Sequence, residues 1–150
     1  MYTVEEFDKE KTKVMNYIMY KKRTEKEVKN KFQNTIQNDM LCDIIDYVKE
    51  AGYLDDRDYI KRAVSEFMSL KNLSIKEIKY KLFTKGVGKE DIEDYFYEHR
   101  DELEDYERKS AKNIVLKKRG LIENDEIAMY LAKKGYKEET IKEVLECKTY

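Results

Sequence analysis

The sequence contains no proline, and glycine and histidine are scarce. Its 150 residues include five glycines, one histidine and two cysteines. Proline and glycine form most tight turns and interrupt helices, so their scarcity argues against a turn-rich β-sandwich or barrel. We therefore predict an all-α protein.

Long hydrophobic runs are absent as well. No stretch of 18 or more apolar residues occurs, and the first residues lack the basic start and apolar run of a signal peptide. The two cysteines, Cys42 and Cys147, lie far apart in sequence, as is typical of proteins in a reducing compartment. We therefore expect a cytoplasmic protein without membrane contact, in which Cys42 is a buried small hydrophobe and Cys147 an exposed thiol.

Residues that would form a catalytic or nucleotide site are missing. His99 is the only histidine, so no site with two imidazoles can form, and we expect it on the surface near an acidic helix end. The run Gly86-Val87-Gly88-Lys89 lacks the first glycine and the hydroxyl residue of a phosphate-binding loop, because Phe83 and Glu90 occupy those positions. We predict no catalytic residue and no cofactor.

Three aspartates could suggest a carboxylate metal site. They are Asp39, Asp43 and Asp46, whose spacing places them on one face of a helix. Solvated helix faces commonly carry such residues, so we predict a solvated face and no metal.

Charged and apolar residues are present in nearly equal amounts, at 42% and 41%. This balance fits thin helical layers over small cores. Apolar residues recur at spacings of three and four in successive segments, as in amphipathic helices. Thr24 with Glu27 and Ser74 with Glu77 have the capping-box spacing that marks helix N-termini. A further helix is expected to begin at Lys109, after an acidic segment.

The apolar positions repeat with a period of about 50 residues, as read by self-comparison of the chain. Val28, Ile78 and Ile127 are separated by 50 and 49 residues, and Gly86 and Gly135, each following a helix, by 49. Units of this size cannot bury a large core alone, so we expect them to stack into an elongated, curved array. We predict three tandem three-helix repeats over residues 1–55, 56–102 and 103–150.

The predicted junction between the first two repeats has a helix stop and a helix start. Glycine past a helix end tolerates the left-handed backbone there, and aspartate accepts hydrogen bonds from the first turn of the next helix. The junction residues are Gly52, Tyr53, Leu54, Asp55 and Asp56.

Two motifs carry a resemblance to a known family. The first is the Gly-Tyr-Leu-Asp-Asp run from Gly52 to Asp56, followed by Arg57, Asp58 and Tyr59, where the family often has phenylalanine in place of Tyr59. The second is the segment from Arg23 to Val28, where Thr24 and Val28 replace a serine and a leucine. The chain resembles the bacterial RecX family over nearly its full length. The resemblance implies a non-enzymatic regulator that binds the RecA filament on single-stranded DNA. It also implies restraint of the ATPase, strand-exchange and co-protease activities of RecA.

Charge is segregated along the chain although the net charge is only −1. Residues 108–119 include six basic and no acidic residues, whereas residues 89–107 include ten acidic and two basic ones. Solvated helix faces explain any single segment equally well; a two-signed surface would instead fit a partner that presents both protein and phosphate. We expect partner contacts at basic clusters near helix ends, namely Lys21, Lys22, Arg23, Lys117, Lys118, Arg119, Lys133 and Lys134.

Aromatic residues add three contact candidates. Among the thirteen tyrosines, Tyr20, Tyr53 and Tyr136 lie at predicted helix ends or junctions. Two other functions stay open at this point: a DNA-binding protein similar to helix-turn-helix domains, and a helical solenoid with a different partner. We expect a monomer that makes at most weak direct contact with DNA.

Overall fold

The computed structural model describes residues 1–146, and this part of the chain is all-α, which confirms the predicted class. The helices are α1 (Val4–Tyr20), α2 (Glu25–Phe32), α3 (Asn38–Glu50), α4 (Asp56–Leu70), α5 (Ile75–Thr84), α6 (Lys89–Glu98), α7 (Arg100–Lys118), α8 (Asn124–Lys134) and α9 (Glu138–Glu146). Within these described residues, no helix combines the length and the hydrophobicity needed to cross a bilayer.

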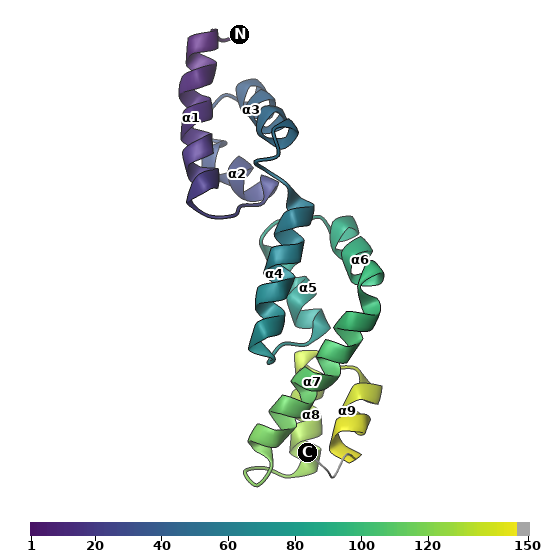
Figure 1. Ribbon diagram of the computed structural model, residues 1–150. Coiled ribbons are helices and arrows are strands. Elements are labelled where there is room, and N and C mark those ends of the chain that lie inside the picture. Colours follow the sequence, from purple (N-terminus) through teal and green to yellow (C-terminus); the bar gives the residue numbers. More distant parts are fainter. Residues whose placement is uncertain (147–150) are drawn as a thin grey trace.

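The helices form three successive groups along an elongated molecule (Figure 1). We call α1–α3, α4–α6 and α7–α9 the first, second and third triplets. Three separate clusters of buried apolar side chains accompany them, running from Val14 to Leu54, from Ile60 to Tyr106 and from Ala111 to Val144. Because each cluster is small, contacts between neighbouring triplets are expected to matter for stability.

Helix α7 begins earlier than the sequence indicated. It starts at Arg100 rather than Lys109, because the acidic segment contains no glycine or proline and an ion pair from Asp105 to Lys109 links successive turns. Leu103 belongs to the second cluster of buried side chains and Ala111 to the third. The predicted boundary between residues 102 and 103 therefore lies inside α7, and the division into three repeats stays a prediction.

Both predicted capping boxes are present. The hydroxyl groups of Thr24 and Ser74 accept hydrogen bonds from the backbone N–H groups of Glu27 and Glu77, at 3.1 Å each. The two glutamates in turn accept from the backbone N–H groups of Thr24 and Ser74. These boxes fix the start of α2 and of α5 and hold each hydroxyl in one orientation.

The stretch from Gly52 to Asp56 has the predicted backbone features. Gly52 has a φ of +82°, and Asp55 accepts hydrogen bonds from the first-turn N–H groups of Arg57 and Asp58. Apart from its chain neighbours, a Cβ atom at Gly52 would meet no atom of residues 1–146 within 4 Å. Its requirement for glycine therefore comes from the backbone angle and not from a close neighbour.

Two side chains lie elsewhere than predicted. Cys42 is exposed, because it falls outside the buried stripe of α3 that includes Ile44. His99 is half-buried, since its ring stacks on that of Tyr95 with centroids 4.0 Å apart. Cys147 lies outside the described residues.

Candidate functional site

The first junction joins the start of α2 to the second triplet. Besides capping α2, the Thr24 hydroxyl donates a hydrogen bond of 2.6 Å to the carbonyl oxygen of Lys85, at the end of α5. The backbone N–H of Glu25 donates to the Asp56 carboxylate at 3.0 Å. Thr24 is fully buried, so this contact is shielded from water. Two backbone groups at helix ends are thus satisfied by the neighbouring triplet.

Burial, hydrogen bonds and ion pairs shift the pKa values of three carboxylates at this junction. Burial raises the pKa of Asp56, although the hydrogen bond from Glu25 acts in the opposite direction. A hydrogen bond from Lys49, with the two charged atoms 2.8 Å apart, lowers the pKa of the Glu25 side chain. Lys22 and Asp58 add an ion pair of 3.0 Å, which lowers the pKa of Asp58.

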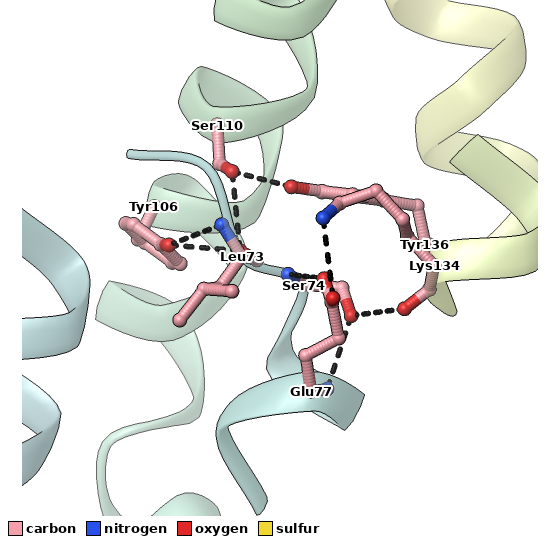
Figure 2. Close-up of polar contacts among 7 residues, drawn as sticks. All are labelled: Leu73, Ser74, Glu77, Tyr106, Ser110, Lys134 and Tyr136. Carbon is pink, nitrogen blue, oxygen red and sulfur yellow. Dashed lines mark hydrogen bonds and ion pairs between the residues drawn. The ribbon is translucent and has the colours of Figure 1, made fainter. Parts of the chain in front are cut away.

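The second junction repeats the same hydrogen bonds. The Ser74 hydroxyl donates to the carbonyl oxygen of Lys134 at 2.7 Å (Figure 2), and the backbone N–H of Ile75 donates to the Glu107 carboxylate at 2.9 Å. Glu107 also accepts from the backbone N–H of Lys137, at 3.3 Å. Ser74, Lys134 and Glu107 lie 50, 49 and 51 residues after Thr24, Lys85 and Asp56. Each junction therefore couples a capping hydroxyl to a helix end in the next triplet.

A further hydrogen-bonded cluster is present at the second junction. Tyr106 and Ser110, both on α7, donate from their hydroxyl groups to the carbonyl oxygen of Leu73, at 2.8 and 3.1 Å (Figure 2). The Ser110 hydroxyl also forms a bond of 2.5 Å with that of Tyr136. All four residues are buried. This cluster fastens α7 to both the loop before α5 and the turn before α9.

The prediction of Tyr136 as a partner contact is therefore wrong. Its side chain is only 4% exposed, and burial raises the pKa of its hydroxyl. The positive φ of Gly135 reverses the chain after α8 and turns the next residue inward. Tyr20 and Tyr53 are 83% and 45% exposed and stay candidates.

The eight predicted basic contacts do not form one surface. Lys21, Lys22 and Arg23 follow α1, whereas the other five lie in the third triplet. Four of the eight have exposed side chains, namely Lys21, Lys22, Lys117 and Lys133.

The other four basic residues are half-buried and make contacts within the molecule. These contacts are Arg23 over the Tyr17 ring at 3.9 Å, Lys118 over the Tyr130 ring at 4.1 Å, Arg119 to the Leu145 carbonyl at 3.0 Å and Lys134 to Glu77 at 3.1 Å. Contact with a partner through any of these would compete with an existing interaction.

A groove along the first junction was not predicted from the sequence. It has a volume of about 760 Å³ and lies between the residues that follow α1 and the side chains of α4. Lys61 and Arg62 on α4 and Lys85 at the end of α5 line it together with Lys21 and Lys22. The sequence signal for the groove is weak, because these residues come from three separate segments.

The predicted aspartate face is solvated as expected. Asp39, Asp43 and Asp46 are all exposed on α3. Over residues 1–146, no group of three or more histidine, cysteine, aspartate or glutamate side chains is arranged to hold a metal ion.

Replacing Thr24 with alanine should separate the junction contact from simple helix capping. We expect Thr24→Ala to lower the free energy of unfolding by about 2 kcal/mol, because both the cap and the bond to Lys85 are lost. Thr3→Ala is the matched control, since Thr3 caps α1 through Glu6 and its side chain is exposed; it should lose only about 1 kcal/mol. Denaturant unfolding measures both, and equal losses would contradict a stabilising role for the bond to Lys85.

Comparison with known proteins reveals relatives that share one description. The chain is 30% identical to "Regulatory protein RecX" of Staphylococcus carnosus, over 88% of this chain and 51% of the relative. It is also 30% identical to the protein of the same description from Staphylococcus epidermidis, over 97% of this chain and 57% of the relative. The chain thus spans little more than half the length of these relatives. No protein-family model matches the sequence.

Solved structures share the fold. The crystal structure of RecX from Lactobacillus salivarius aligns with a TM-score of 0.80 at 23% identity, covering 96% of this chain and 97% of that one. A second crystal structure, of "regulatory protein RecX", aligns with a TM-score of 0.81 at 18% identity, covering 94% of this chain and 73% of that one. The all-α arrangement of this chain therefore also occurs in crystal structures.

Proposed function

Because this chain belongs to the RecX family of regulatory proteins, we propose that it regulates the RecA recombinase by binding the RecA filament on single-stranded DNA. It lies in the filament groove across neighbouring protomers and excludes substrates that use the same groove. It thereby inhibits ATP hydrolysis, strand exchange and co-protease activity, without catalysing a reaction itself. It acts in the cytoplasm as a monomer.

The observation that carries this proposal is the pair of matching junctions along an elongated molecule. Thr24 bonds to Lys85 at the first, and Ser74 bonds to Lys134 at the second. A chain of similar units joined in a similar way can present similar surfaces at regular intervals. A filament presents its own protomers at regular intervals, so the two can match over more than one protomer. In this proposal the units are the predicted repeats 1–55, 56–102 and 103–150.

The contacts that we propose for the filament are the exposed members of the predicted basic clusters. Lys21 and Lys22 lie at the end of α1, Lys117 lies at the end of α7 and Lys133 lies near the end of α8. Long lysine side chains at these ends can reach acidic protein groups or phosphates. Such pairs steer association and set register more than they add affinity.

Inhibition of RecA-catalysed ATP hydrolysis tests the function directly. We expect added protein to lower the rate of ATP hydrolysis by RecA on single-stranded DNA. The double change Lys117→Glu and Lys133→Glu should raise the protein concentration needed for this inhibition by about tenfold. Lys9→Glu, which changes an exposed lysine outside these clusters, is the control. An unchanged rate at several-fold excess of protein would contradict the proposal.

A measurement of binding to DNA in the absence of RecA distinguishes the proposed regulator from the main alternative, a direct DNA-binding protein. A protein that binds DNA directly would bind bare single-stranded or duplex DNA, with an affinity that falls steeply as salt rises. The proposed regulator should bind bare DNA weakly, because its net charge is −1.

A further inference from the structure

The groove at the first junction has cations on both of its sides. Lys21 and Lys22 approach it from the first triplet, and Lys61, Arg62 and Lys85 from the second. A ligand that fills the groove would therefore contact both triplets. Its volume of about 760 Å³ lies within the range of protein ligand sites.

Three of these cations form no ion pair within the part of the chain that the structure describes. Lys21, Lys61 and Lys85 form no salt bridge with any other described residue, whereas Lys22 and Arg62 both pair with Asp58, at 3.0 and 3.1 Å. The unpaired cations make an anionic ligand favourable.

The groove also contains carboxylates and aromatic rings. Glu66 on α4 is an exposed lining residue and faces the same space. Tyr59 and Phe67, two turns apart on α4, are half-buried and offer apolar surface between the charges. A nucleic-acid strand carries a negative charge at every phosphate and would meet Glu66 and Asp58 unfavourably. A polypeptide can place its charges selectively and bury an apolar side chain between them.

The second junction shows that this open groove is not an automatic result of the fold. Lys134 occupies the position 49 residues after Lys85 and pairs with Glu77 at 3.1 Å. Asn113 occupies the position 51 residues after Arg62, and its side-chain amide donates to the carbonyl oxygen of Lys71 at 3.1 Å. At the second junction both side chains therefore bond to the neighbouring triplet. At the first junction Arg62 pairs with Asp58 on its own helix, and the Lys85 side chain forms no salt bridge with a described residue.

We propose that the groove at the first junction binds an acidic, amphipathic polypeptide segment of a partner protein. Carboxylates of the segment pair with Lys21, Lys61 and Lys85, and an apolar side chain packs against Tyr59 and Phe67. Because the ligand touches both triplets, its binding also fixes the angle between them. The inference deepens the proposed function and rests on it only in that the partner is a protein.

A peptide binding assay tests this site without RecA. The probe is a fluorescent peptide of about 18 glutamate, alanine and leucine residues, long enough to form an amphipathic helix. We expect the double change Lys61→Glu and Lys85→Glu to weaken binding by about tenfold or more, because two attractions become repulsions. The control changes are Lys9→Glu and Lys81→Glu, which alter exposed lysines outside the groove, and they should leave the affinity unchanged.

Three results would overturn the site. Peptide affinity could stay the same in the Lys61 and Lys85 variant, or a peptide with lysine in place of glutamate could bind equally well. Alternatively, oligothymidylate could be the ligand whose binding depends on Lys61 and Lys85. If the peptide binds as expected while ATP hydrolysis by RecA is unaffected, the proposed function fails and the groove stands. The opposite pair of results rejects the groove alone.

Discussion

Replacing Gly86 with alanine is expected to destabilise the protein by about 2–3 kcal/mol. Gly86 has a φ of +96°, and an L side chain in this region is strained by about 1–2 kcal/mol. An added Cβ would also lie 2.5 Å from the Cβ of Lys26, which is fixed to the backbone of α2. The two triplets must then separate, which weakens the bond between Thr24 and Lys85 by about 1 kcal/mol.

Gly52 and Gly120 provide matched controls for the Gly86 change. Their φ angles are +82° and +84°, and a Cβ at either position would meet no atom of the described residues within 4 Å apart from its chain neighbours. Gly52→Ala and Gly120→Ala should therefore lose only the backbone strain, about 1–2 kcal/mol. If Gly86→Ala loses no more stability than Gly52→Ala in denaturant unfolding, the close contact at the first junction makes no measurable contribution to the free energy of unfolding.

Replacing Glu107 with alanine should destabilise the protein by about 2–6 kcal/mol. Its carboxylate is 2% exposed and accepts hydrogen bonds from two backbone N–H groups, those of Ile75 and Lys137. Ile75 begins α5 and Lys137 precedes α9, so two helix N-termini point at one anion. Alanine leaves both N–H groups without an acceptor in a buried place, at about 1–3 kcal/mol each.

Two other variants sharpen the test at Glu107. Glu107→Gln keeps one acceptor oxygen and should lose roughly half as much stability. Glu104→Ala is the control, because Glu104 is one turn earlier on α7, is exposed and has one ion pair of 3.6 Å, to Lys137. We expect it to change stability by less than about 0.5 kcal/mol. Equal effects of Glu107→Ala and Glu104→Ala in thermal or denaturant unfolding would contradict a structural role for the buried carboxylate.

Local signals in the sequence were sufficient for the helices and their caps. Thr24, Ser74 and Asp55 cap the helices that their spacing predicts, because a capping bond reaches only two or three residues along the chain. The positive φ of Gly52 follows from similarly local rules. The start of α7 at Arg100 differs from the predicted start at Lys109, because a change from acidic to basic residues does not by itself end or begin a helix.

The junction contacts could not be predicted in the same way. Thr24 bonds to a carbonyl oxygen 61 residues later, and every residue type carries such an oxygen, so the sequence contains no pattern for the acceptor. The burial of Tyr136 is not evident from the sequence for a related reason. Its position after Gly135 indicates a turn, but its burial depends on Ser110, which lies 26 residues earlier on α7.

The groove illustrates a further limit of sequence reasoning. Lys61 and Arg62 look like ordinary solvated residues of an amphipathic helix. They gain a shared environment with Lys21 and Lys85 only through the angle at which the first two triplets meet. Angles between helical units depend on packing, which apolar periodicity does not specify.

The binding stoichiometry on RecA filaments tests the central claim most directly. Saturating amounts of the chain would be sedimented with RecA filaments on single-stranded DNA, and the bound ratio measured. If each elongated chain spans neighbouring protomers in the groove of the RecA filament, we expect saturation at fewer chains than protomers, with binding along the whole filament. Saturation at one chain per protomer, binding only at filament ends, or no binding to the filament would contradict the account.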